Sequence, residues 1–119
     1  MKISLLLPVF LVLLSGPAFS ESRVSPDVVC KESPSGFTYN FYFGFGEIHI
    51  FDETGKELDH LDSMTLRVGE GFQRGMAFEK YSFVHEEGDV VAYVTFKKGS
   101  KLGKGEMIDN DQRLFCKRD

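Results

Sequence analysis

The stretch FTYNFYFGFGEIHIF, residues 37–51, decides the fold class. Its first seven residues alternate with period two, the pattern of a β-strand that buries one face. The side chains expected on the buried face are Phe37, Tyr39, Phe41 and Phe43. A second alternating run follows at residues 47–51. Gly44 and Gly46, between the two runs, predict a sharp bend or a close approach of two backbones.

Six further segments carry strand signals and are separated by turn sequences. The turns Asp52–Gly55 and Glu86–Asp89 both combine acidic residues with a glycine that accepts left-handed backbone. The glycine-rich segments Gly69–Gly75 and 98–105 are expected to be exposed loops. The expected strands are residues 37–43, 47–51, 56–61, 64–68, 77–83, 90–97, 106–108 and 112–117. Such short antiparallel strands predict an all-β domain, either a small barrel of about eight strands or a two-sheet β-sandwich.

Two cysteines, Cys30 and Cys116, lie near the ends of this strand-rich region. In an oxidising compartment they are expected to form a disulfide that closes a loop of 86 residues. A reactive thiol is disfavoured, because neither cysteine belongs to a CxxC motif. The bridge would join the first and last strands, which favours a closed barrel over a sandwich.

The first 20 residues have the features of a secretory signal peptide. Lys2 is followed by an apolar run, Leu5–Leu14, and small residues precede a cleavage point after Ser20. The apolar run is too short to span about 30 Å of hydrocarbon, so no membrane span is expected. We therefore expect residues 21–119 to form a single exported domain, periplasmic or secreted.

The charge of the mature chain restricts its partners. Without Lys2 the 14 basic residues become 13, against 18 acidic residues, a formal net charge of −5. Nucleic acids and anionic membranes bind basic surfaces, so neither is the expected main partner. A basic protein partner is compatible with this charge.

Motifs for catalysis or metal binding are lacking. His49, His60 and His85 have no spacing typical of zinc ligands, and the acidic pairs fall at turns, where they point outward. No serine sits in a nucleophile-elbow motif. We therefore expect a protein that is not an enzyme, with no catalytic residues, no bound metal and no cofactor.

The segment Gly69–Gly75 is the best candidate for partner binding. It carries Phe72, a large aromatic residue of the kind that anchors interfaces, and Arg74, which can form forked hydrogen bonds to carboxylates. The competing interpretation is an ordinary mobile loop. Our hypothesis from the sequence is therefore that this segment binds a partner.

Residues 74–78 and 81–89 resemble a stretch of the periplasmic and membrane-bound inhibitors of C-type lysozyme. The resemblance implies an exported eight-stranded barrel that inserts a loop into the lysozyme cleft. Where that family has a serine and a lysine that meet the catalytic carboxylates, this chain has Arg74 and Glu87. Arg74 would supply a charge that pairs with a carboxylate, whereas Glu87 would repel one. Phe72 and Phe78 would be the apolar anchors.

The resemblance predicts a non-catalytic binding protein whose partner is a basic protein such as lysozyme. Other interpretations stay open at this point. The chain could be a structural module of the cell envelope, or a small barrel that holds an apolar ligand against the aromatic strand at residues 37–45. A metal-dependent enzyme is the weakest of these alternatives.

Overall fold

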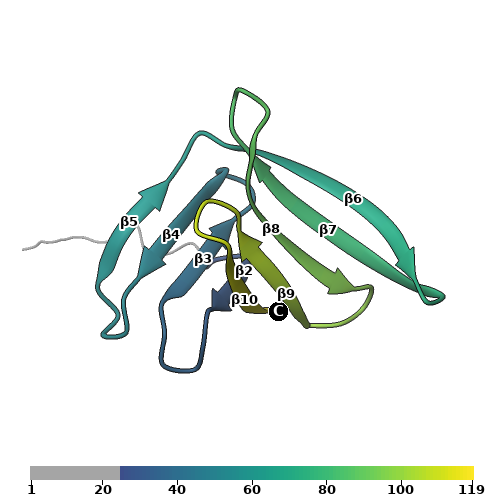
Figure 1. The fold of residues 1–119 in the computed structure, drawn as a ribbon, viewed down its shortest axis with the longest axis horizontal. Coiled ribbons are helices and arrows are strands. Elements are labelled where there is room, and N and C mark those ends of the chain that lie inside the picture. Colours follow the sequence, from purple (N-terminus) through teal and green to yellow (C-terminus); the bar gives the residue numbers. More distant parts are fainter. Residues whose placement is uncertain (1–24) are drawn as a thin grey trace, which may run out of the picture.

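The computed structural model describes residues 25–119, so the predicted signal peptide at residues 1–20 lies outside the described residues. The described chain forms one antiparallel sheet of nine strands (Figure 1). Their bounds are β2 (Val28–Lys31), β3 (Thr38–Tyr42), β4 (Glu47–Phe51), β5 (Glu57–Leu61), β6 (Thr65–Gln73), β7 (Met76–Val84), β8 (Val90–Lys97), β9 (Leu102–Met107) and β10 (Gln112–Arg118). The all-β prediction is confirmed for this part of the chain. No helix within it is long and apolar enough to cross a membrane.

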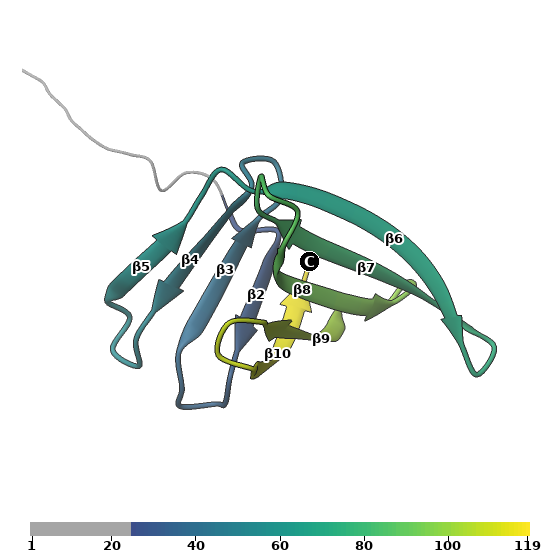
Figure 2. The ribbon, with the colours of Figure 1, turned by 45° about the horizontal axis from the view of Figure 1, so that its top comes forward.

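The strand order is β5-β4-β3-β2-β10-β9-β8-β7-β6. The first and last strands, β2 and β10, are therefore neighbours in the middle of the sheet. Its two edges are β5 and β6, which follow each other in the chain. The sheet curls into a half-barrel whose β3–β5 and β6–β8 wings diverge from a common end (Figure 2). We expected a closed barrel, but β5 and β6 are the two ends of the strand order.

The predicted disulfide is present. Cys30 lies directly opposite Cys116 on the neighbouring strand, with their Cα atoms 4.0 Å apart. The bridge joins the last strand to β2, the first strand of the described residues, which was not predicted from the sequence, and it lies at the centre of the sheet rather than at its opening. Two glycines of β9 make room beside it. A Cβ atom on Gly105 would lie 2.6 Å from the Tyr93 carbonyl oxygen and 3.3 Å from the Cys116 sulfur, and one on Gly103 would collide with Phe96.

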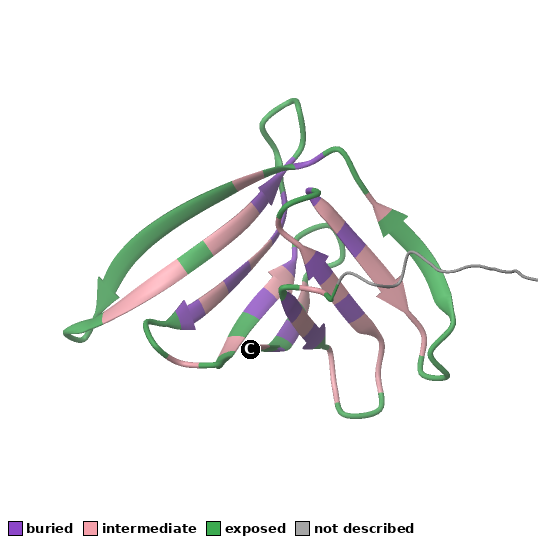
Figure 3. Ribbon diagram, turned by 180° about the vertical axis from the view of Figure 1, so that it is seen from behind, coloured by how far each residue is buried: buried purple, intermediate pink, exposed green. Residues whose placement is uncertain are grey.

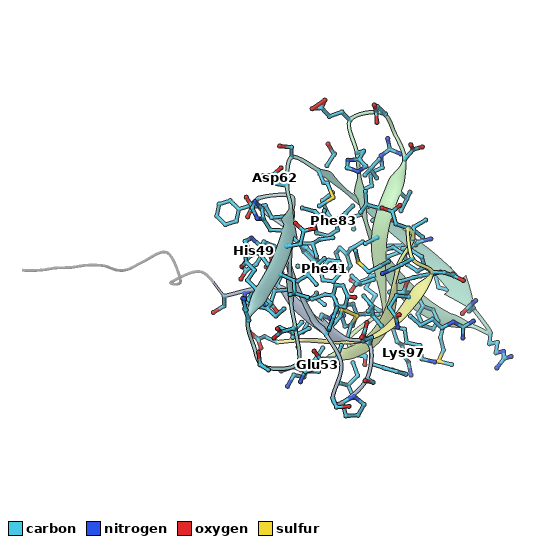
Figure 4. All side chains as sticks on the ribbon, turned by 60° about the vertical axis from the view of Figure 1, so that its left-hand side comes forward. Phe41, His49, Glu53, Asp62, Phe83 and Lys97 are labelled. Carbon is cyan, nitrogen blue, oxygen red and sulfur yellow. A yellow bond between two sulfur atoms is a disulfide. The ribbon has the colours of Figure 1, made fainter. Side chains whose placement is uncertain are left out.

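The hydrophobic core lies on the inner face of the half-barrel. Phe41 of β3 and Phe83 of β7 are fully buried, and their rings pack edge to face with centroids 5.4 Å apart. Figure 4 shows these two side chains beside each other near the centre of the molecule. Buried residues follow the middle strands, whereas exposed residues run along the outermost ones (Figure 3). The predicted alternation of β3 is confirmed, since Tyr39 and Phe41 are both buried.

The closed end of the half-barrel depends on the glycine-rich bend after β3. Gly46 has a left-handed φ of 63°, and a Cβ atom there would overlap the carbonyl oxygen of Met64. Met64 lies in the short connection between β5 and β6, and its N–H donates to the Gly46 carbonyl at 3.2 Å. The predicted close backbone approach is confirmed. It fixes the connection between β5 and β6 against the β3–β4 turn.

Two expected loops are partly strands. The segment 98–105 contains the start of β9, which begins at Leu102. The segment Gly69–Gly75 was also wrongly expected to be irregular, because β6 continues to Gln73. In both cases glycines alternate with larger residues and pair with a neighbouring strand, so the sheet accepts them in regular ladders. By contrast, the bounds of β4 and β8 agree with the expected strands.

Candidate binding surface

The distal half of the β6–β7 hairpin, residues 69–78, is here called the arm. Its base lies beside the end of β8, where Phe78 pairs with Lys97, and its tip projects beyond β8 at the lower right of Figure 1. Arg74 and Gly75 form the two-residue turn at its tip, with φ values of 52° and 78°. Positive φ at both central residues is the mark of a type I′ turn, whose twist matches that of paired strands. Arg74 is therefore presented by a regular hairpin and not by a loop.

The four predicted partner-binding residues do not form one cluster. Phe72 pairs with Ala77, whereas Phe78 pairs with Gly71, so the two phenylalanines lie on opposite faces of the arm. Phe72 is 78 % exposed. Glu87 lies in the turn beyond Val84, at the far end of the nine-residue strand β7. The length of that strand, roughly 30 Å, separates Glu87 from the tip that carries Arg74.

A groove of about 770 Å³ crosses the outer face of the sheet, opposite the core. It runs from the arm, at Gln73 and Phe78, over β8 and β9 to β10. We call it the outer groove. A smaller hollow of about 340 Å³, over Gly69 and Gly71, shares Gln73, Phe78 and Thr95 with it. The outer groove is lined by Gln73, Phe78, Tyr93, Thr95, Lys97, Leu102, Gly103, Lys104, Gly105, Glu106, Arg113, Leu114 and Phe115.

The outer groove combines cations with exposed apolar side chains. Leu102 and Phe115 are 68 % and 62 % exposed. Lys97, Lys104 and Arg113 are its cations, and the carboxylate of Glu106 is its single anion. The Tyr93 hydroxyl donates to Glu106 Oε1 at 2.8 Å, and this hydrogen bond is the main reason that the pKa of Tyr93 is raised.

Charge is distributed unevenly between the β3–β5 wing and the strands β8–β10. Residues 38–66 hold six carboxylates but only one basic residue, Lys56. Residues 90–119 hold seven basic residues and four acidic ones. The carboxylates of the first segment are Glu47, Asp52, Glu53, Glu57, Asp59 and Asp62. The molecule is therefore dipolar, and its net negative charge belongs mainly to the β3–β5 wing.

His49 lies between two carboxylates on the outer face of that wing. Its Nδ1 is 3.1 Å from Glu57 Oε1 and its Nε2 is 3.0 Å from Glu47 Oε1. The His60 ring stacks on it at 5.4 Å. Burial alone would lower the pKa of His49, but the hydrogen bonds to both carboxylates outweigh burial and raise it. Among residues 25–119 no group of three or more His, Cys, Asp or Glu residues is arranged to hold a metal ion.

The closed end of the half-barrel interior is filled. Phe43 of the β3–β4 turn stacks on Tyr81 of β7 at 4.8 Å, next to the pair of Phe41 and Phe83. These side chains pack against one another beside the aromatic strand. The two hollows described above lie on the outer face instead.

No known protein family, curated protein or solved structure matches this chain. The likeness to lysozyme inhibitors thus remains an expectation drawn from the sequence.

The outer groove was not predicted from the sequence. Its residues on β9 and β10 alternate as Leu102, Lys104, Glu106 and then Arg113, Phe115. That alternation is a strand signal, but the intervening glycines of β9 made the segment resemble a loop. The assembly of three strands into one groove also depends on their pairing, which no local pattern reveals.

Proposed function

We propose that this chain is an exported, non-catalytic binding protein that inserts the tip of its arm into a cleft of a partner protein. The observation that supports the proposal is the projecting hairpin, with Phe72 78 % exposed beside a tip that carries Arg74. A paired hairpin is already ordered, so its insertion loses less conformational entropy than that of a flexible loop. Phe72 would pack against an apolar wall of the cleft, and Arg74 would form an ion pair with an anionic group inside it.

A C-type lysozyme is the partner that we propose first. Its cleft contains catalytic carboxylates, which suit the guanidinium of Arg74. The acidic β3–β5 wing lies on the opposite side of the molecule from the arm, so it would favour the approach of a basic protein only through long-range attraction. Glu87 takes no part in this contact, because it lies at the other end of β7. The repulsion that the sequence predicted between Glu87 and the catalytic carboxylates is therefore avoided.

The test is the rate at which a C-type lysozyme clears a cell-wall suspension, with and without the mature chain. Arg74→Asn is the sharpest variant, because Asn-Gly suits a type I′ turn while the positive charge is lost. Loss of a charged hydrogen bond, about 1.5–3 kcal/mol, predicts inhibition weakened roughly tenfold to a hundredfold. Arg67→Gln, on β6 but away from the tip, is the matched control.

Two results would overturn this proposal. One is an unchanged clearing rate at micromolar excess of the wild-type chain, together with no retention of lysozyme on the immobilised protein. The other is equal inhibition by the wild type and by Arg74→Asn, which would show that the tip does not enter the cleft.

The outer groove favours a second candidate function, the binding of a small amphiphilic anion. Leu102 and Phe115 would cover its apolar part, while Lys104 and Arg113 would bind its charge. The probe is anilinonaphthalene sulfonate, whose fluorescence should rise on binding and fall with added salt. Lys104→Glu should abolish the rise, whereas Lys56→Glu, on the acidic wing, should not. Equal fluorescence from both variants would remove this candidate.

A further inference from the structure

The two edges of the sheet differ in how well they are protected from pairing. Edge strands with unpaired backbone groups attract other strands, and proteins usually block them with charges, bulges or short length. β5 has these protections: it spans five residues, three of them Glu57, Asp59 and His60, and its register with β4 is irregular. β6 carries the charged residues Arg67 and Glu70, but it spans nine residues in unbroken register with β7 and has no bulge, lysine or proline.

The exposed side chains of β6 add to this contrast. Val68 is 61 % exposed and Phe72 is 78 % exposed, both on the inner face of the edge strand. Gly69 and Gly71 face the other side, and a Cβ atom on either would meet nothing within 4 Å. The inner face of the edge is thus apolar apart from Glu70, and the outer face has open space at Gly69 and Gly71, beyond Arg67.

The direction of the free backbone groups follows from one hydrogen bond. The Ala77 carbonyl accepts from the Lys98 N–H at 2.9 Å, so the backbone of Ala77 points toward β8 and away from β6. Phe72 lies opposite Ala77 and must point its own N–H and C=O in the other direction, toward the open edge. Backbone direction alternates along a strand, so the N–H and C=O groups of Leu66, Val68 and Glu70 also point toward the open edge.

We propose that the β6 edge pairs with β6 of a second copy of this chain, antiparallel and about a two-fold axis at Gly69. In this register Leu66 of one copy lies opposite Phe72 of the other, and Val68 lies opposite Glu70. All four outward residues then find a hydrogen-bonded partner. The interface is isologous, as expected for a two-fold dimer.

Neighbouring registers are poorer. A shift of the pairing centre to Glu70 places Glu70 directly opposite its copy, and like charges in that position are destabilising. A shift to Val68 leaves Phe72 unpaired. In the Gly69 register the Glu70 carboxylate faces an apolar residue and keeps Lys98 at 4.0 Å. The pattern of β6 therefore suits one register of self-pairing.

This inference does not rest on the proposed function. Pairing uses the edge of β6 and covers Phe72, the anchor of the proposed insertion, so self-pairing and insertion of the arm exclude each other, although Arg74 at the tip stays exposed in the dimer. The alternative occupants of the edge are a strand of another protein and β5 of the same chain, which would close the barrel. Both predict a mature chain that does not self-associate.

Sedimentation and light scattering of the mature chain are expected to show a dimer at high micromolar concentration. Val68→Pro should raise the dimer dissociation constant roughly tenfold or more, because it removes an outward N–H from each copy. Proline is tolerated there, since no hydrogen bond to β7 is lost. Leu58→Lys, on the β5 edge, is the control and should stay dimeric. A monomeric wild type would overturn the proposal.

Cysteine substitutions test the register itself. Gly69→Cys should give a disulfide-linked dimer under mild oxidation, because residue 69 faces its own copy across the axis. Gly71→Cys faces Arg67 of the other copy and should remain uncrosslinked, although a side chain fits equally well at both glycines. Mass spectrometry of the unreduced proteins distinguishes the two. Equal crosslinking at both positions would overturn the Gly69 register.

Discussion

Phe41 and Phe83 touch across the interior of the half-barrel, with ring centroids 5.4 Å apart, although β2, β10, β9 and β8 lie between their strands in the sheet. The contact exists because the sheet curls until its two wings meet at the closed end. It therefore links the β3–β5 wing to the β6–β8 wing without any backbone pairing between them. The stability of the curl should depend on these rings.

Truncation of one ring tests this dependence. Phe83→Ala should lower the free energy of unfolding by about 3–5 kcal/mol, because it leaves a cavity in a closely packed core. Phe115→Ala removes the same side chain from an exposed position and should change the stability by less than about 0.5 kcal/mol. Urea unfolding measures both. Similar losses in the two variants would contradict the placement of the core.

Reduction of the Cys30–Cys116 bridge should destabilise the domain by about 4–5 kcal/mol, since the bridge closes a long loop in the unfolded chain. Urea unfolding with and without reductant measures the loss. The double variant Cys30→Ala/Cys116→Ala should be insensitive to reductant, which separates the bridge from other effects. An unchanged midpoint in the reduced wild type would contradict the prediction.

Gly105 and Gly71 provide a matched pair of strand glycines. Gly105→Ala should cost about 1–3 kcal/mol, because the new Cβ would lie 2.6 Å from the backbone oxygen of Tyr93. Gly71→Ala meets nothing within 4 Å and should change the stability by less than about 0.5 kcal/mol. Thermal unfolding of the two variants gives the comparison. Equal melting temperatures would show that β9 can shift to accept the methyl group.

Local patterns were sufficient for the strands that bury one face. β4 and β8 could be bounded from the sequence because large apolar residues alternate along them and turn residues end them. The end of β6 could not, since Gly69 and Gly71 have no strand preference of their own. They are held in the ladder by Lys80 and Phe78 of β7.

The sequence patterns also could not predict where the sheet opens, that is, which two strands form its edges. The two cysteines predicted a bridge between the ends of the strand-rich region, but β2 was not predicted as a strand, and the bridge lies at the centre of the sheet. Of the candidate site, Phe72, Arg74 and Phe78 could be found as a group because they are close in sequence. Their distribution over two faces, and the separation of Glu87, follow from the pairing register, which requires the structure.

The carboxylates beside His49 should make the stability of the domain depend on pH. They raise the pKa of His49 in the folded chain above its unfolded value of about 6.5, so the charged imidazole stabilises the fold. This stabilisation is complete below that unfolded value and is lost as the pH rises through the folded pKa. His49→Gln should flatten this fall in the urea midpoint, measured from about pH 5 to 8. The control variant His85→Gln, in the exposed β7–β8 turn, should show the same fall in the urea midpoint as the wild type. If the midpoint of His49→Gln still falls over this pH range, a group other than His49 causes the fall.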